Sequence, residues 1–306
     1  MSDSHNKKIN VPFSEKLQFE RAVAEYINLI DSAPIRISKY HEKSDAENSF
    51  YSRFTLNHGS KNIDTFHREL LLELMERFPT RVKFIKVPNS ILELFKLEFS
   101  RIRKIIESDN EYVFDWKNDR FAKDLGICTF RLIPAGAQLV EIHGFPRRVI
   151  FNKISHILPN LYFYLYRLKG GKPIYTIHTH QGNLHDFNPD GWNRCYVRIG
   201  QLLKVNPEIK GMQGGSWFYD PALKTISPRL AYLREIPCQN GAAIFFASTE
   251  DHTSSALSTS LSRVEKFKAG EYVPRAFVLA WPRKALITFS DKNSHVLATD
   301  SERINY

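Results

Sequence analysis

The chain has 306 residues, of which 42% are hydrophobic and 13% aromatic, and its formal net charge is +10 at pH 7. This apolar fraction is too high for a disordered chain, and no apolar run approaches the roughly 18 residues that a membrane span needs. The three cysteines, Cys128, Cys195 and Cys238, are scattered and odd in number, which excludes a disulfide framework and a cysteine-based zinc site. We therefore expect a globular, cytoplasmic protein without a membrane span.

The charge is unevenly divided along the chain. Residues 1–125 carry 21 Lys/Arg and 20 Asp/Glu, whereas residues 126–306 carry 22 and 13. A basic surface of this kind suits a phosphate-bearing or otherwise acidic small molecule, an acidic carrier protein or nucleic acid. A solvated basic surface without a ligand is the alternative interpretation.

The first 125 residues are expected to be mainly helical. Apolar residues recur at helical spacing between Ser14 and Pro34, between Asp64 and Pro79, and after the capping box Ser90-Ile91-Leu92-Glu93. The polar segment 35–61 lacks such periodicity, and we interpret it as a loop.

Short β-rich runs begin near Gly126, so we place a domain boundary there and expect residues 126–306 to form a mixed α/β catalytic domain. The predicted strands are 129–133, 138–142, 161–168, 174–180, 209–219, 230–236, 242–247, 275–281 and 285–289. The predicted helices are 147–158, 188–206 and 254–268. The glycines 170–171 favour a β-hairpin between 161–168 and 174–180. The fold class is therefore α+β, a helical N-terminal region followed by a mixed-sheet C-terminal domain.

Two histidines on one predicted strand suggest a metal site. Residues two apart on a strand face the same side, so His178 and His180 point together, and His185 or His252 can supply a third ligand. Neutral imidazoles suit Zn(II) and Fe(II). One hypothesis is therefore a mononuclear non-heme iron or zinc enzyme, an oxygenase or a hydrolase.

A second group of candidates surrounds Gly214-Gly215. A double glycine in a strand indicates a bulge or a close backbone approach, which is frequent beside ligand sites. Trp217, Tyr219 and Arg229 are the candidate substrate-binding residues, because an arginine can hold a carboxylate with two hydrogen bonds. Asp220 can accept a proton from a substrate amine. The alternative is that these aromatic residues belong to the core.

The order of hairpin, helix, three-stranded meander, helix and strand across residues 162–281 resembles the core of the GNAT acyltransferase superfamily. The resemblance implies acyl transfer to an amine from an acyl-CoA or acyl-carrier donor, whose phosphate lies at a helix N-terminus. The corresponding segment is rich in hydroxyl groups, and its candidate cofactor-binding residues are Thr253, Ser254, Ser255 and Arg263. The candidate catalytic residues in this interpretation are His178, His180 and Asp220.

A third class of function is a nucleic-acid-binding module. The basic surplus of residues 126–306 motivates it, and the aromatic run at Tyr162, Phe163, Tyr164 and Tyr166 can serve as a stacking surface for bases. An aromatic sheet face packed on a helix is the alternative explanation of that run.

Overall fold

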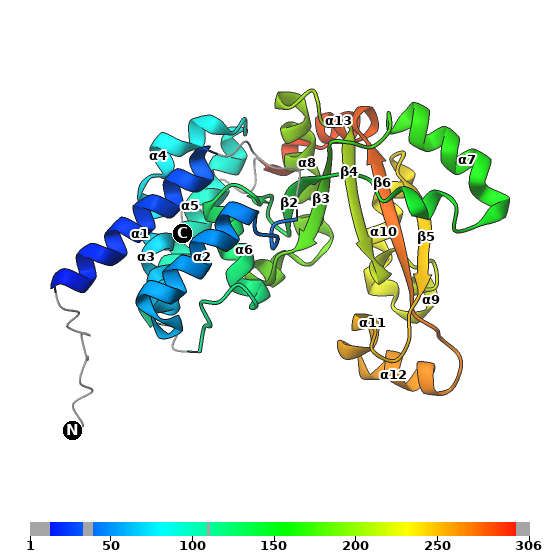
Figure 1. Cartoon of the computed structure of the whole chain (residues 1–306). Coiled ribbons are helices and arrows are strands. Elements are labelled where there is room, and N and C mark those ends of the chain that lie inside the picture. Colours follow the sequence, from blue (N-terminus) through cyan, green and yellow to red (C-terminus); the bar gives the residue numbers. More distant parts are fainter. Residues whose placement is uncertain (1–12, 33–38, 109–110, 298–306) are drawn as a thin grey trace, which may run out of the picture. The chain divides into compact units, whose positions relative to one another are not determined.

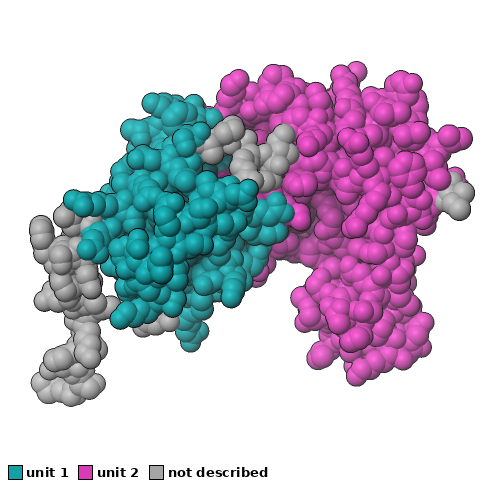
Figure 2. All heavy atoms as spheres, viewed as in Figure 1, with its two compact units in different colours: residues 1–36, 40–84, 99–130 teal, residues 37–39, 85–98, 131–306 magenta. Residues whose placement is uncertain are grey.

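The computed structural model describes residues 13–32, 39–108 and 111–297 (Figure 1). The chain divides into two compact units, coloured separately in Figure 2. Unit 1 comprises residues 1–36, 40–84 and 99–130, and unit 2 comprises residues 37–39, 85–98 and 131–306. The α+β class is confirmed, since helices dominate the N-terminal part and a sheet follows. Within the described ranges, no helix has the length and apolar character that crossing a membrane requires.

Unit 1 is built from helices around an aromatic core. Its elements are α1 (Phe13–Ser32), α2 (Asp45–His58), η1 (Ser60–Asn62), α3 (Ile63–Glu76), α4 (Phe78–Arg81), η2 (Val82–Phe84), the second half of α5 (Asn89–Ser108) and α6 (Asp119–Cys128). The rings of Tyr26, Phe50 and Phe66 are buried, and their centroids lie 5.1–6.1 Å apart. The predicted helices at 14–34, 64–79 and from residue 90 are therefore confirmed for their described parts.

The loop predicted at 35–61 is wrong for residues 45–58, which form α2. Ser44 caps this helix, since its hydroxyl accepts from the Glu47 backbone N–H at 3.1 Å while the Glu47 carboxylate accepts from the Ser44 N–H at 2.8 Å. Phe50 and Phe54 then bury one face of the helix. Residues 33–38 of the predicted loop lie outside the described residues.

Unit 2 contains a mixed sheet with the strand order β1-β2-β3-β4-β6-β5. The strands are β1 (Ile133–Pro134), β2 (Gln138–His143), β3 (Ile174–Thr179), β4 (Gly211–Ser216), β5 (Ala243–Thr249) and β6 (Arg275–Pro282). Only β3 and β4 pair in parallel among these described strands, with Tyr175 opposite Met212 and Thr176 opposite Gln213. The other pairs are antiparallel. The parallel ladder stops after these two pairs, although both strands continue for three residues.

Helices cover both faces of this sheet. On one face lie α8 (Pro189–Val205), α10 (Tyr232–Gln239) and α13 (Arg283–Lys292), and the Trp281 ring packs there at 5.1 Å from those of Tyr196 and Phe289. On the other lie η3 (Arg147–Ile150), η4 (Ile154–His156), α7 (Ile157–Tyr162) and the π-helix η5 (Phe163–Arg167). There Phe145 and Tyr164 share a buried cluster with Val278 and Ala280.

Short elements follow the strand ends. They are η6 (Gln181–Asp186), η7 (Trp217–Tyr219), α9 (Leu223–Ile226), η8 (Pro228–Leu230), α11 (Ser255–Ser258), α12 (Leu261–Lys268) and η9 (Ser294–Leu297). Figure 1 shows α11 and α12 together at the end of the sheet where β5 finishes and β6 starts. The single helix predicted at 254–268 is thus two helices, because Ser260 between them is extended, with φ −160°.

Three predicted strands are wrong, since residues 161–168, 230–236 and 285–289 are mostly helical. Tyr164 and Leu168 lie one helical turn apart and both enter the buried cluster. Strand β3 consequently pairs with β2, and the predicted hairpin of 161–168 with 174–180 is also wrong. Of the predicted strand 129–133 only Ile133 is in a strand, β1, because the turn after α6 occupies residues 129–132. Short apolar runs do not by themselves distinguish a strand from a buried helix.

Other local predictions are confirmed. Helix α8 starts after Asn188, whose side chain accepts from the Gly191 N–H at 2.9 Å, with Pro189 in the first turn. Gly214 marks a close approach, since a Cβ there would lie 2.7 Å from the Tyr219 Oη and 2.8 Å from the Ile177 Cγ1. Any larger residue at 214 would therefore displace β3 or Tyr219.

Candidate functional site

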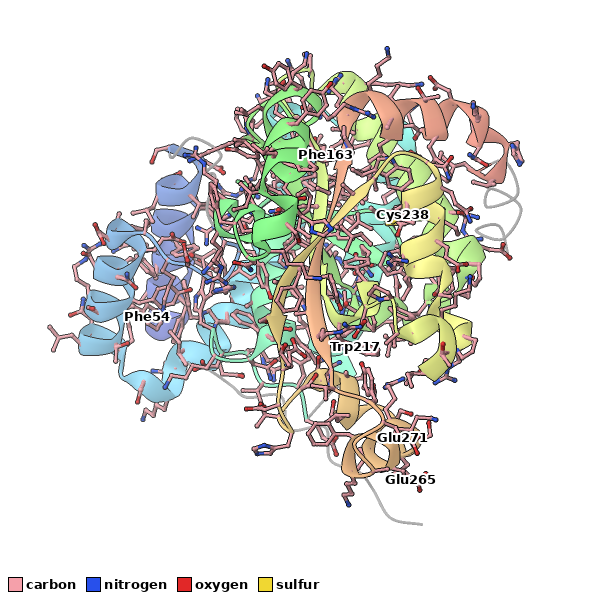
Figure 3. The ribbon with its side chains drawn as sticks, turned by 90° about the vertical axis from the view of Figure 1, so that its right-hand side faces the viewer. Phe54, Phe163, Trp217, Cys238, Glu265 and Glu271 are labelled. Atoms are coloured by element: carbon pink, nitrogen blue, oxygen red, sulfur yellow. The ribbon has the colours of Figure 1, made fainter. Side chains whose placement is uncertain are left out.

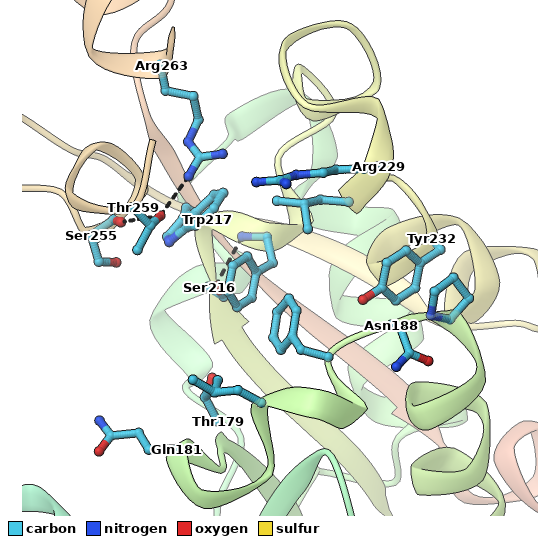
Figure 4. Close-up of a pocket in the computed structure, with 15 residues that line it drawn as sticks. Thr179, Gln181, Asn188, Ser216, Trp217, Arg229, Tyr232, Ser255, Thr259 and Arg263 are labelled. Carbon is cyan, nitrogen blue, oxygen red and sulfur yellow. Dashed lines mark hydrogen bonds between the residues drawn. The ribbon is translucent and has the colours of Figure 1, made fainter. Parts of the chain in front are cut away.

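The candidate site is a pocket of about 760 Å³ in unit 2, at the ends of β3 and β4 (Figure 4). Thr179 is the last residue of β3 and Ser216 the last of β4, and both line the pocket. In open α/β sheets, ligands bind at the carboxyl ends of parallel strands, where the backbones separate. The pocket has that location, and its volume is in the range of small-molecule sites.

The lining is mainly apolar with hydroxyl, amide and guanidinium groups among it. The residues are Thr179, Gln181, Leu184, Phe187, Asn188, Pro189, Ser216, Trp217, Phe218, Arg229, Leu230, Tyr232, Ser255, Thr259 and Arg263. Two of them are positively charged and none is Asp, Glu, His or Lys. The pocket therefore has a net positive charge and no carboxylate of its own.

Arg263 is the most unusual residue of the pocket. Its side chain is 98% buried, and its guanidinium lies 4.6 Å from the centre of the Trp217 ring. It donates hydrogen bonds from Nε to the Ala256 carbonyl at 2.6 Å, from Nη1 to Ser227 Oγ at 3.0 Å and from Nη2 to Thr259 Oγ1 at 2.7 Å. These bonds use three of the five N–H groups. All three acceptors are uncharged.

The environment of Arg263 does not compensate its charge. Burial is the main cause that lowers the pKa of Arg263, whereas Tyr272 raises it and the positive charge of Arg229 lowers it. Over the part of the chain that the structure describes, neither arginine forms an ion pair with a carboxylate. Figure 4 shows both guanidinium groups at the same end of the pocket, next to Trp217. Two neighbouring cations without an anion favour the binding of an anionic group between them.

Tyr232 contributes a second polar group. Its hydroxyl is buried and lacks a hydrogen-bond partner among the described residues. Burial raises the pKa of Tyr232, so the phenol stays protonated at neutral pH. The phenol is therefore an unused donor in the pocket wall, and because its oxygen has almost no accessible surface, a ligand reaches it only after a local shift of that wall.

Four of the residues that the sequence singled out come together in this pocket, namely Trp217, Arg229, Ser255 and Arg263. They come from four different elements, η7, η8, α11 and α12. In Figure 3, Trp217 lies at the lower end of the sheet, above α12. The pocket thus lies between the end of the strand that carries His178 and the turn that carries Trp217.

The candidate histidines His178, in β3, and His180, directly after β3, have carboxylate neighbours elsewhere in unit 2. His180 is 97% buried, with Nε2 2.7 Å from Glu98 Oε1. Its Nδ1 accepts from the Gly182 N–H at 3.2 Å, so Nε2 carries the hydrogen and donates to Glu98. His178 Nε2 lies 3.1 Å from Glu141. Neither histidine lines the pocket.

Asp220 and Tyr219 are buried beside the pocket rather than in its lining. The Asp220 carboxylate accepts from Arg275 Nη2 at 2.6 Å and Nε at 3.3 Å, and from the Ala222 N–H at 2.9 Å. Three hydrogen bonds therefore hold this carboxylate in place. Tyr219 is 98% buried, next to Gly214.

Thr253 and Ser254 form the turn before α11. Thr253 donates from its N–H and hydroxyl to Asp251, and the Ser254 hydroxyl donates to Glu250. These bonds fix the loop, and neither residue lines the pocket. Of the four candidate cofactor-binding residues, Ser255 and Arg263 alone are in the lining.

The metal hypothesis has no support from the geometry. His185 and His252 are exposed, and His185 lies 4.0 Å from Asp186. Across the described ranges, no group of three or more His, Cys, Asp or Glu side chains could hold a metal ion.

Sequence reasoning missed Tyr232, Thr259 and Phe187 as lining residues. The segment around Tyr232 was predicted as a strand, although Ser227-Pro228 is a signal for a helix start, with proline in the first turn. That signal would have placed Arg229 and Tyr232 three residues apart on one helical face. No such signal points to Phe187.

Comparison of the chain with protein-family models, curated proteins and solved structures found no match. The geometry of the pocket is therefore the basis for a functional proposal.

Proposed function

We propose that unit 2 is a group-transfer enzyme that binds a small molecule with an anionic group, such as a phosphate, in the pocket between β3 and β4. The observation that carries this proposal is Arg263, a buried guanidinium beside a second cation, Arg229, and without a carboxylate partner in the described part of the chain. A buried charge without a partner destabilises the fold by several kcal/mol, and a bound anion would offset this cost. Arginine also suits phosphate and carboxylate oxygens because it donates two parallel hydrogen bonds.

The rest of the ligand is proposed to be largely apolar or flat. Phe187, Trp217, Phe218 and Leu230 are among the apolar residues that line the pocket. Such a wall suits an acyl chain, a pantetheine-like arm or a ring system, with Asn188 and Ser216 for orientation. An acyl-CoA or acyl-carrier donor, as the resemblance to GNAT acyltransferases implies, combines a phosphate with such an arm.

The reaction that we propose is acyl transfer from a thioester to an amine. The amine nitrogen attacks the carbonyl carbon, a nitrogen–carbon bond forms and the carbon–sulfur bond breaks. The proton that nitrogen loses passes to water, and the departing thiolate gains one from water. Tyr232, whose phenol stays protonated, donates a hydrogen bond to the departing sulfur. The proposal assigns no step to His178, His180 or Asp220.

Binding can be measured by calorimetry and by thermal unfolding with coenzyme A, acetyl-CoA and inorganic phosphate as separate probes. We expect coenzyme A and acetyl-CoA to bind and to raise the melting temperature. At a ligand concentration of 100 times the dissociation constant, binding adds about 2.7 kcal/mol to the free energy of unfolding. Arg229→Ala should weaken binding by at least tenfold without destabilising the protein, because Arg229 is exposed and has no hydrogen-bond or ion-pair partner among the described residues. Arg148→Ala, at another exposed arginine, is the matched control.

The catalytic part of the proposal has a separate readout. Tyr232→Phe should keep the affinity for acetyl-CoA while the rate of acyl transfer to an amine library falls by about 10- to 1000-fold. If neither coenzyme A nor acetyl-CoA binds, or if Arg229→Ala binds them as the unaltered protein does, the proposed ligand class is wrong.

A further inference from the structure

Two adjoining cavities with basic linings lie at the opposite end of β4 from the pocket described above. The first, of about 630 Å³, is lined by Tyr166, Arg167, Lys169, Gln239, Asn240, Pro282, Lys284, Ala285, Thr288, Phe289 and Lys292. The second, of about 400 Å³, is lined by Arg167, Lys169, Pro207, Lys210, Arg283, Lys284, Ile287 and Thr288. Lys210 precedes β4, whereas Ser216 of the proposed active site ends it. We call these two the basic cavities.

The basic cavities concentrate positive charge without acidic residues. Six cations line them, three of which, Arg167, Lys169 and Lys284, line both cavities, and no Asp or Glu lines either one. Of the six, Arg283 is held by the Asn206 and Ile209 carbonyls at 2.8 and 3.3 Å. For the described residues, no ion pair involves Arg167, Lys169, Lys284 or Lys292. These four side chains are exposed, and their charges are available to an outside partner.

An apolar stripe lies next to the basic cavities. Leu158, Tyr162, Leu165 and Tyr166 on α7 and η5 are 78%, 60%, 50% and 68% exposed. Their spacing of four, three and one residues puts them on one helical face, while Tyr164 and Leu168 bury the opposite face. Tyr166 belongs to the stripe and also lines the first cavity, so the two features are continuous. Figures 1 and 3 both show α7 and α13 at the same end of the sheet.

The combination identifies the kind of partner. Cations beside exposed leucines and tyrosines are typical of helices that lie in the interface of an anionic bilayer, where tyrosine occupies the headgroup layer. A nucleic acid would use the cations and tyrosines but gains nothing from exposed leucines, which cannot stack on bases as rings do. The leucines therefore favour the lipid surface.

We propose that this end of unit 2 docks on an anionic lipid surface, with headgroup phosphates in the basic cavities and the stripe inserted among the headgroups. The docking is peripheral and combines electrostatic attraction with insertion of the stripe, and it leaves the pocket between β3 and β4 accessible from the other end of the sheet. The proposal is independent of the ligand that the pocket binds.

Flotation of the full chain with vesicles tests the proposal. We expect binding to phosphatidylcholine vesicles that contain about a quarter phosphatidylglycerol and none to pure phosphatidylcholine, with the affinity falling as salt screens the charges. Neutralising one cation at the surface lowers the affinity for an anionic membrane about fivefold. The triple variant Lys169→Gln, Lys284→Gln and Lys292→Gln should therefore bind the anionic vesicles about 100-fold more weakly. A matched triple variant on α9 and α12, Lys224→Gln, Lys266→Gln and Lys268→Gln, should bind as the unaltered protein does.

The apolar contribution has its own variant. Leu158→Ser with Leu165→Ser should weaken vesicle binding about tenfold without loss of stability, because both side chains are exposed. Leu56→Ser, at an 85% exposed leucine of unit 1, is the control. Arg229→Ala should retain full vesicle binding, which separates this surface from the proposed active site.

Three outcomes would overturn the inference. The first is equal binding to neutral and anionic vesicles. The second is vesicle binding by the double leucine variant at the strength of the unaltered protein, which would show that the stripe does not insert and that the cavities bind anions alone. The third is binding of a single-stranded oligonucleotide that the lysine variant loses, with no binding to either vesicle, which would identify a nucleic-acid surface instead.

Discussion

Replacing Arg263 by methionine separates a ligand-binding role from a structural one. Methionine keeps an unbranched chain over Trp217 but removes the guanidinium. The three hydrogen bonds to Ala256, Ser227 and Thr259 are lost, at about 1–2 kcal/mol each. Removal of a buried charge without a carboxylate partner recovers several kcal/mol of desolvation. Because these contributions oppose each other, the free energy of unfolding of the ligand-free protein should change by less than about 2 kcal/mol.

The affinity for an anion should respond differently. Truncating one partner of a buried charge pair costs about 2–5 kcal/mol, so the dissociation constant for coenzyme A should rise by at least about 30-fold. Urea denaturation measures the first quantity and calorimetry the second, with Arg148→Met as the surface control. The reasoning is refuted if Arg263→Met lowers the unfolding free energy by more than about 3 kcal/mol and leaves the affinity unchanged, since Arg263 would then serve packing alone.

Three further predictions concern stability. Burial lowers the pKa of His67 to about 4 from its usual 6.5, so the unfolded chain takes up a proton at this residue before the folded protein does as the pH falls. The free energy of unfolding should therefore drop by about 3 kcal/mol between pH 6.5 and pH 4. His67→Gln should flatten this part of the pH profile in urea denaturation. Gly200→Ala should destabilise the packing of α8 on α13 by about 1–3 kcal/mol, because its Cβ would lie 2.2 Å from the Ser290 Cβ, and an unchanged melting temperature would contradict this. Asp220→Asn should cost about 1–2 kcal/mol at pH 7 by breaking the pair with Arg275, which is 39% exposed; stability equal to that of the unaltered protein would show that the pair is dispensable.

Helix α7–η5 illustrates where local patterns were insufficient. The run Leu161 to Leu168 is apolar and aromatic, which suits a strand as well as a helix. The choice between strand and helix depends on the buried cluster around Phe145 and Phe245. Tyr164 and Leu168, one helical turn apart, both pack into that cluster. Helix α13 is a similar case, since Leu286 and Phe289 are buried against elements almost a hundred residues earlier in the chain.

The site shows the same division. The unusual residues around Gly214, the arginines and the serine-rich segment were recognisable because their types and spacing are rare in a plain core. The sequence did not show which of these candidates line the pocket, because that depends on their partners. His180 lies against Glu98, and Asp220 pairs with Arg275. Those partners lie 82 and 55 residues away, beyond any local pattern.

By itself the sequence determined the α+β class, the capped helices such as α8, and the close approach at Gly214, because caps, turns and glycine requirements act within a few residues. The tertiary structure alone decided that β3 pairs with β2 and β4, and that Trp217, Arg229, Ser255 and Arg263 share a pocket which His178, His180 and Asp220 do not line. The physical reason is that burial and charge compensation depend on residues far apart in the chain.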